Sequence, residues 1–380
     1  MVVFVIYWFS NPHPSNYFDY PFRIAGAFLQ GRLGLVQPPP GWLNEFIPWH
    51  GEYYCGFPLG SVLTMIPLAI LQAFGFISDF PGSIVSAAIA AVAAGVCFLM
   101  SRRYKLSQAS RLMLALLPVV GTWMWCNLAF ASAWQVDLGF GFLGQLLALY
   151  FILDNPRPLV AGLCFALAFG NRTELLLGGP ILLYLIYRRE PNRGRRAMAY
   201  FLIAPAILLA LTLTYNYLRF SSIMDFGNSH VPGVLNEPWY RYGIWSFHAI
   251  PNNMKQMLFE RWKTIGHYPY VVPSGFGGSV FLSCPFLFFA FTREARDPVL
   301  KRVCWAAAVI LMFCLWLHGN TGGWQYSYRY AIELLPWMFV VLLESSPLTV
   351  SPLRGGVFGL SVLINAYAVY LFLWTGYITP

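Results

Sequence analysis

Long apolar runs separated by polar segments dominate this chain. Most are close to the roughly 17–25 residues of a membrane-spanning helix, and none alternates with the period of two that membrane strands require. The pattern therefore predicts an all-α integral membrane protein with about eleven spanning helices in one domain, 1–380. The apolar runs cover 1–10, 57–77, 83–100, 112–131, 138–153, 158–172, 174–188, 198–216, 276–292, 302–318, 329–345 and 355–375.

Lys and Arg residues gather in the short segments between these runs. Fifteen of the 24 fall in five such segments, and cytoplasmic loops of membrane proteins carry this excess. The alternation predicts that the two long polar stretches, 11–56 and 217–275, share the opposite, non-cytoplasmic face. The five basic segments are 101–111, 154–157, 188–197, 293–302 and 345–354.

The N-terminal region breaks the alternation. If 1–10 and 57–77 both cross, Arg102 and Arg103 lie outside, so one of the two segments does not cross. The segment 57–77, with two prolines, suits a helix along or dipping into the membrane face, which leaves 11–56 outside. The alternative is that 1–10 does not cross and 11–56 is cytoplasmic. As a helix, 1–10 is only about 15 Å long, so either the chain start has lost residues or this helix spans only with help.

Composition supports the membrane assignment. Hydrophobic residues make up 58% of the chain and charged residues 10%, against about 25% in soluble domains. The net charge of +9 is explained by orientation signals, so no nucleic-acid partner is expected. The seven cysteines form no CxxC pair and are typical of small core residues, and the histidines lack metal-ligand spacing, so no structural metal is expected.

The stretch 16–35 predicts a helix in the interface plane. Asp19 is placed to cap it, Pro21 falls in its first turn, and an apolar stripe follows. The next segment adds Glu45, His50 and Glu52 among Trp and Tyr residues. Either a carboxylate here acts as general base on an acceptor hydroxyl, or Asp19 is only a cap and the rest an interfacial aromatic belt.

Charged residues inside apolar runs are the second candidate group, since ionisable groups at membrane depth are costly. Arg172 either pairs with Glu174 or faces a lipid phosphate, for which a guanidinium is well shaped. Arg329 likewise either pairs with Glu333, four residues on, or faces a phosphate or sugar. Asp137 has no basic neighbour in sequence, which favours a functional role.

The order of these segments resembles the GT-C superfamily of membrane glycosyltransferases, specifically bacterial relatives of the protein O-mannosyltransferase and aminoarabinose-transferase type. Asp19 matches the acidic residue before the juxtamembrane helix RIAGAFLQGRL, and EYYCGFPLG matches the Tyr/Pro stretch that follows. Asp137 matches a second acidic residue, Arg172 matches a basic turn residue, and GGWQYSYRYAIELLPW resembles a late Gly/Trp, Arg-Tyr and Pro tract. The similarity runs from about residue 16 to about residue 345.

The resemblance implies transfer of a sugar from a polyprenyl-phosphate-linked donor to a glycan, lipid or protein acceptor at the exoplasmic face, in a bacterial plasma membrane. Asp19 would be the base, with Asp137 and Glu52 orienting donor or acceptor. Relatives often carry two adjacent acidic residues at the first position, but this chain has Asp19 alone. No organic cofactor is implied, although some relatives use a divalent cation.

The remaining candidate positions have binding roles. The donor phosphate is expected at Arg172 and Arg329, and the acceptor or sugar at His50, Trp324 and Tyr328. Two other classes stay open: a transporter or flippase, although no inverted repeat is visible, and a catalytically degenerate relative of the transferases.

Overall fold

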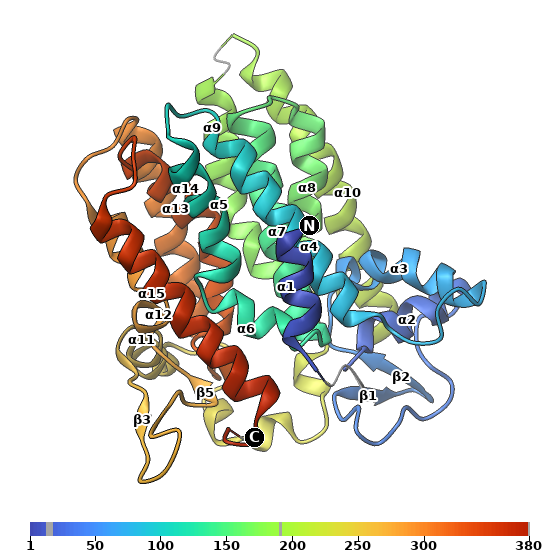
Figure 1. Cartoon of the computed structure of the whole chain (residues 1–380). Helices are drawn as coiled ribbons and strands as arrows, with labels where there is room; N and C mark the ends of the chain where they lie inside the picture. Colours follow the sequence, from blue (N-terminus) through green and yellow to red (C-terminus); the bar gives the residue numbers. More distant parts are fainter. Residues whose placement is uncertain (13–17, 190–191, 379–380) are drawn as a thin grey trace.

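In the computed structural model, which describes residues 1–12, 18–189 and 192–378, the chain is a bundle of α-helices (Figure 1). The first half contains α1 Val2–Ser10, α2 Tyr20–Leu29, α3 Leu59–Ala73, α4 Gly82–Ser101, α5 Gln108–Val120, α6 Met124–Ala129, α7 Ala133–Leu153 and α8 Pro158–Asn171. The second half contains α9 Gly179–Arg189, α10 Gly194–Phe220, α11 Ile250–Phe259, α12 Val280–Ser283, α13 Pro298–Leu317, α14 Leu335–Ser345 and α15 Pro352–Val369.

Short helical turns and strands connect these helices. The turns are η1 Thr173–Gly178, η2 Asn228–His230, η3 Val234–Asn236, η4 Pro238–Tyr240, η5 Phe247–Ala249, η6 Pro285–Phe291, η7 Arg329–Leu334 and η8 Tyr370–Trp374. The strands are β1 Phe46–Trp49, β2 Glu52–Cys55, β3 Lys263–Thr264, β4 Val271–Val272, β5 Phe276–Gly277 and β6 Gln325–Tyr326. The pairs β1–β2 and β3–β4 are antiparallel, whereas β5 and β6 are parallel.

Every predicted apolar run coincides with helical structure. Among the described residues, five helices are long and apolar enough to cross a membrane: α4, α7, α10, α13 and α15 with η8. The apolar helices α3, α5 and α8 are shorter, and the runs 174–188, 276–292 and 329–345 begin as or contain 3₁₀ turns. The chain is therefore a predominantly α-helical protein with five candidate spans, fewer than the eleven expected from sequence.

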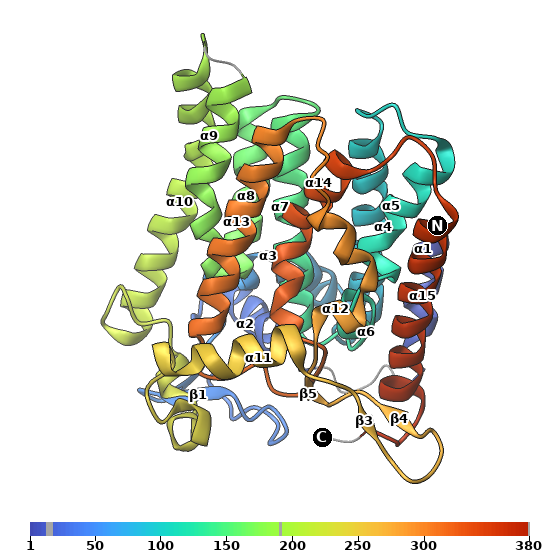
Figure 2. The same ribbon diagram turned by 90° about the vertical axis from the view of Figure 1, so that its left-hand side faces the viewer.

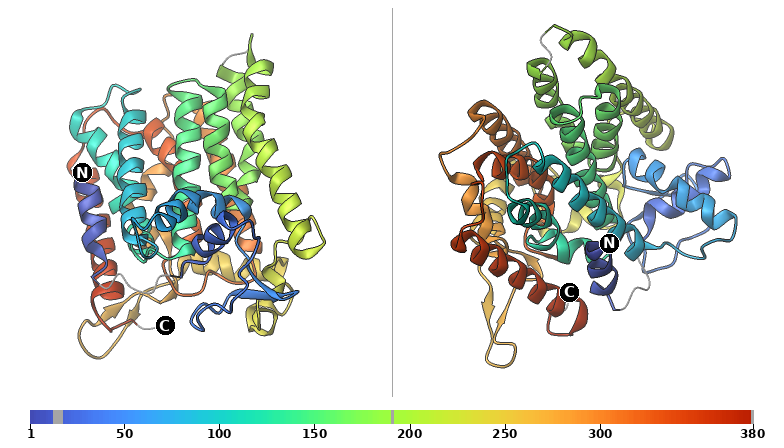
Figure 3. Two further views of the ribbon diagram at one scale, coloured as in Figure 1. Left: turned by 90° about the vertical axis from the view of Figure 1, so that its right-hand side faces the viewer. Right: turned by 45° about the horizontal axis from the view of Figure 1, so that its top comes forward.

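Helix α3 lies across the bundle, unlike the long helices (Figures 1 and 3). Its Gly60 touches α8 so closely that a Cβ there would come within 2.4 Å of the Gly170 backbone. Helix α1 packs along α4. Neither α1 nor α3 is among the five candidate spans, so which of 1–10 and 57–77 crosses stays a prediction.

Glycines bring the central helices into backbone contact. A Cβ on Gly144 of α7 would lie 2.7 Å from the Ala168 nitrogen of α8, and one on Gly162 would lie 2.1 Å from the Phe201 oxygen of α10. Small residues are the usual means by which membrane helices approach closely, because lipid offers no hydrophobic drive to associate. Helix α8 is therefore packed with its backbone against both α7 and α10.

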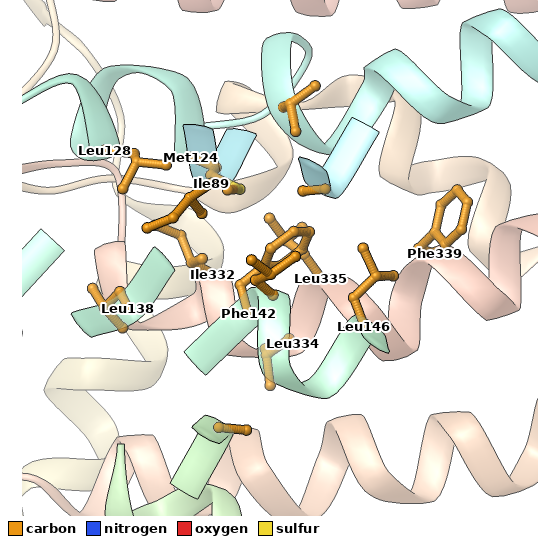
Figure 4. Close-up of a cluster of buried hydrophobic side chains, with 14 of the residues drawn as sticks. Ile89, Met124, Leu128, Leu138, Phe142, Leu146, Ile332, Leu334, Leu335 and Phe339 are labelled. Carbon is orange, nitrogen blue, oxygen red and sulfur yellow. The ribbon is translucent and has the colours of Figure 1, made fainter. Parts of the chain in front are cut away.

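A buried apolar cluster fixes α7 against the late part of the chain. Phe142 and Leu146 of α7 pack with Ile332 and Leu335 of the η7–α14 segment, and Ile89 of α4 lies beside them (Figure 4). Because each of these residues is at most 3% exposed, the cluster sets the position of η7, which carries candidate site residues.

The five basic loops meet at one end of the bundle (Figure 2). The Ser107 N–H donates to the Leu348 carbonyl at 2.7 Å, and Arg188 forms two hydrogen bonds with Asp297, at 2.9 and 3.0 Å. The loops that the charge pattern assigns to one side are therefore physically joined. We call this the basic end.

The two long polar stretches meet at the opposite end, which we call the long-loop end (Figure 2). Ile47 and Tyr54 of the β1–β2 hairpin form a small buried cluster with Phe220. The His230 ring lies 4.6 Å from the Trp49 ring and hydrogen-bonds Asp225 at 2.7 Å. The stretches 11–56 and 217–275 thus share one face, as the sequence predicts.

Candidate functional site

A buried ion cluster joins two 3₁₀ turns at the long-loop end. Arg172 follows α8, and its Nε donates to Glu333 of η7 at 2.9 Å while its Nη2 bonds Glu174 of η1. Glu333 is fully buried. The alternative that Arg172 pairs with Glu174 is therefore confirmed, and a second carboxylate, remote in sequence, completes the cluster.

The pair expected between Arg329 and Glu333 does not form. Residues 329–334 are a 3₁₀ helix with three residues per turn, so positions four apart do not face each other. Glu333 turns toward Arg172, and the Arg329 Nη1 reaches only the Trp324 carbonyl, at 3.4 Å. Arg329 is 7% exposed, and its Nε has no hydrogen-bond partner within the described chain.

The Tyr330 ring brings the two arginines together. The Arg172 and Arg329 guanidinium carbons lie 4.9 and 5.3 Å from its centroid, within the range of a cation–π contact. His318, directly after α13, packs against the same ring at 5.7 Å. Its Nδ1 lies 2.8 Å from the Asn320 carbonyl, which leaves Nε2 as an acceptor, and burial lowers the pKa of the imidazole.

Glu45 is the carboxylate from the first long stretch that faces Arg329. It accepts a hydrogen bond from the Trp134 indole at 3.0 Å, and its N–H donates to the Tyr20 hydroxyl at 3.4 Å. Burial raises the pKa of the Glu45 carboxyl to about 7, opposed by the Trp134 bond and by the nearby Arg329 charge. A half-buried carboxyl that ionises near neutrality suits a general base.

Asp137 lies one helical turn beyond Trp134 on α7. It is 1% exposed, and its Oδ2 accepts a hydrogen bond from Ser61 of α3 at 2.6 Å. Its Oδ1 has no hydrogen-bond partner in the described structure. A buried carboxylate oxygen without a partner is costly, so Asp137 is the in-membrane acid that the fold explains least.

Asp19 occupies the N-cap position of α2, as predicted, but makes no capping hydrogen bond. Its Oδ1 instead accepts from Arg23 at 2.8 Å. Burial raises the pKa of Asp19, the bond and charge of Arg23 oppose that shift, and Asp79 adds a small upward effect. The neighbours of Asp19 are thus Arg23 and Asp79, whereas those of Glu45 are Trp134 and Arg329.

Glu52 and His50 lie on the β1–β2 hairpin. Glu52 accepts from the Tyr54 hydroxyl at 2.8 Å, and His50 is an exposed turn residue with φ of +49° beside Trp49. The structure does not bring either side chain into contact with the Arg172 and Arg329 groups.

Trp324 and Tyr328 differ in their access to the site. Trp324 is half-buried and adjoins Arg329 through its carbonyl, with its ring against Phe276 and Phe372. Tyr328 is fully buried, and its hydroxyl donates to the Leu315 carbonyl at 3.2 Å. Tyr328 is therefore a packing residue in this structure, and we leave it out of the proposed site.

No metal-binding site is apparent in the part of the chain that the structure describes. Among the described residues, no group of three or more His, Cys, Asp or Glu side chains is placed to hold a metal ion. The seven cysteines are all free, and five of them are buried. Arg172, Arg329 and His318 meet at the Tyr330 ring. We add the carboxylates of Glu45 and Asp137, on which the charges of Arg329 and Arg172 act, and take these five residues as the candidate site.

The fold and site define an α-helical, membrane-type protein with a charged cluster at one end of its helices. Comparison of the chain with models of known protein families, with curated proteins and with solved structures finds no match.

Proposed function

We propose that this chain is a multi-pass membrane glycosyltransferase of the GT-C type, which moves a sugar from a polyprenyl-phosphate donor to an acceptor at the non-cytoplasmic face. The observation that carries the proposal is Arg329, a buried guanidinium whose Nε has no partner among the described residues and whose charge acts on the half-buried carboxyl of Glu45. Such a transfer needs a cation that binds the leaving phosphate and a base that takes the proton of the acceptor hydroxyl.

The proposed reaction is a single displacement at the anomeric carbon of the donor sugar. A carboxylate takes the proton of an acceptor hydroxyl as its oxygen bonds to the anomeric carbon, and the bond from that carbon to the phosphate oxygen breaks. The leaving polyprenyl phosphate gains negative charge, which a guanidinium stabilises. The configuration at the anomeric carbon is inverted, and no covalent enzyme intermediate is needed.

The surroundings of the carboxylates favour Glu45 over Asp19 as the base. Glu45 is within reach of the Arg329 charge and forms no ion pair among the described residues, whereas the Asp19 carboxylate accepts a hydrogen bond from Arg23 at 2.8 Å. A carboxylate already paired with a guanidinium is a weaker base. Asp137, held by Ser61, would orient the donor from the membrane side.

The two arginines receive different roles. Arg329 would bind the donor phosphate, because its Nε is free for a new acceptor. Arg172 already serves two carboxylates and would hold η1 and η7 in place beneath the site. The half-buried ring of Tyr330, shared by both guanidinium groups, offers a stacking surface at the same position.

Profiling of lipid-linked sugars tests the proposal. In a deletion strain, one prenyl-phosphate-linked sugar is expected to accumulate, and wild-type protein restores its consumption. Arg329→Gln is expected to leave the accumulation in place, whereas Arg241→Gln, an exposed arginine in the same half of the chain, restores it. A deletion strain with an unchanged lipid-linked sugar profile would contradict the proposed function.

A further inference from the structure

A second polar cavity lies at the basic end, remote from the candidate site. Its volume is about 330 Å³, and it is formed where α4, α7 and α9 end (Figure 1). Ligand-binding pockets for small molecules begin at about this size. The lining residues that matter here are Arg102, Arg103, Tyr150, Asp154 and Arg189.

Three guanidinium groups face one carboxylate in this cavity, and only one of the three is bonded. Arg103 donates to the Leu153 carbonyl at 3.3 Å and lies 3.9 Å from Asp154. Within the described residues, the side chains of Arg102 and Arg189 make no hydrogen bond or ion pair. Two of the three guanidinium groups in the cavity therefore have no partner within the described residues.

The helix ends account for part of this charge. Three helices end at the cavity, and their unpaired carbonyl groups attract cations, so arginines are expected there. Arg103 places its positive charge at the C-terminal end of α7, where it donates a hydrogen bond to the Leu153 carbonyl. Arg102 and Arg189 are exposed side chains that bind no carbonyl in the described structure, so they are free to bind an anion that enters the cavity.

Exposed apolar surface adjoins the cavity on α4. Leu99 lines the cavity and is 40% exposed, and Val92, two helical turns earlier on the same face, is 50% exposed. A polar chamber with free guanidinium groups beside an apolar wall matches a ligand with an anionic head and a hydrocarbon tail.

We propose that this cavity binds the headgroup of an anionic phospholipid. Arg102 and Arg189 bind its phosphate, and Tyr150 and Asp154 receive a hydroxylated headgroup. One acyl chain lies along α4 beside Leu99. Tyr150 supplies a hydroxyl donor and the Asp154 carboxylate supplies an acceptor for headgroup hydroxyls. The proposal does not rest on the proposed transferase activity.

Lipid titration of the purified full-length protein in detergent tests the site, with native mass spectrometry as the readout. The probes are phosphatidylglycerol, phosphatidylcholine and soluble glycerol phosphate. Wild-type protein is expected to retain phosphatidylglycerol in preference to phosphatidylcholine. Glycerol phosphate, which lacks the chains, is expected not to compete at equal concentration.

A charge-matched pair of double variants locates the site. Arg102→Gln with Arg189→Gln is expected to weaken phosphatidylglycerol binding about thirtyfold, taking about 1 kcal/mol for each basic residue. Arg193→Gln with Arg195→Gln removes the same charge from exposed positions nearby and is expected to leave binding within about twofold of wild type. Arg102→Lys with Arg189→Lys should retain most of the affinity and reports on folding.

Three results would overturn the proposal. Equal losses in the two Gln double variants would mean that only the overall charge of this end attracts lipid. Equal retention of phosphatidylglycerol and phosphatidylcholine would mean that no anionic headgroup is recognised. Effective competition by glycerol phosphate would mean that the cavity binds a soluble phosphate compound and not a lipid.

Discussion

The Arg172 cluster and the Arg329 site contact the same tyrosine ring, yet they differ in how their charge is used. Arg172 bonds Glu174 and Glu333, so its positive charge is more than balanced. Arg329 is the more buried of the two, but in the described structure it has one long contact to a carbonyl and an unpaired Nε. The burial of an arginine therefore does not by itself indicate what it binds, whereas the number of its partners does.

This difference separates stability from function. Breaking a buried ion pair leaves a charge without a partner and costs more than the pair itself contributes. Removing a cation that has no partner leaves no unpaired charge in the folded protein. The predictions below test this division, beginning with the base that would act beside Arg329.

The largest expected effect is on turnover. Glu45→Gln removes the proposed base and should lower the transfer rate about 10²–10⁴-fold, measured with a synthetic prenyl-phosphate sugar in nanodiscs. Asp19→Asn should stay within about tenfold of wild type, a loss well below that expected for a missing base. If Asp19→Asn abolishes transfer and Glu45→Gln does not, the base is Asp19, as the resemblance in sequence implies.

Removal of Arg172 should act on stability. Arg172→Ala leaves Glu333 fully buried without its cation, and we expect a cost of about 3–5 kcal/mol in the free energy of unfolding. Thermal unfolding in detergent measures this against Arg329→Ala, which breaks no ion pair. Equal losses of stability in the two variants would remove the distinction between the two regions.

Removal of Arg329 should act on donor binding. For a charge-assisted contact, Arg329→Ala is expected to cost about 1.5–3 kcal/mol of binding free energy, seen as a higher Michaelis constant for the donor. Arg329→Lys keeps the charge but loses the planar fork and should lose less. Wild-type donor affinity in Arg329→Ala would move the phosphate site to other basic residues of the long-loop end.

The smallest expected effect is on the pH dependence. The pKa of Glu45 is about 7 because burial raises it, and only the ionised carboxylate can accept a proton. Turnover in wild type should therefore rise by about tenfold in all as the pH increases from about 6 to about 8. In Glu45→Gln, the residual activity should lack this rise, and a persisting rise would assign it to another group.

Several parts of the fold could be predicted from sequence. The apolar runs mark where helices form, and the clustering of Lys and Arg identifies the loops that meet at the basic end. The prolines of 57–77 indicated the helix that lies across the bundle. The number of spans could not be obtained in this way, because residues 173–178 and 329–334 are 3₁₀ turns that an apolar run does not distinguish from α-helix.

The candidate site could be predicted only in part. Arg172, Arg329 and Asp137 stand out in sequence because they are ionisable residues in apolar runs. The pairing of Arg172 with Glu333 joins residues 161 positions apart, and no local pattern contains it. Glu45 lies in the acidic loop already singled out, but its contact with Trp134 depends on how that loop folds back onto α7.

The central claim is that the long-loop end binds a lipid-linked phosphate at Arg329. Crosslinking with a photoactivatable polyprenyl phosphate in nanodiscs, followed by peptide mapping, tests it most directly. The account predicts crosslinks to residues 324–330 that are lost in Arg329→Gln and kept in Arg241→Gln. Crosslinks confined to the basic end, or unaffected by Arg329→Gln, would contradict it.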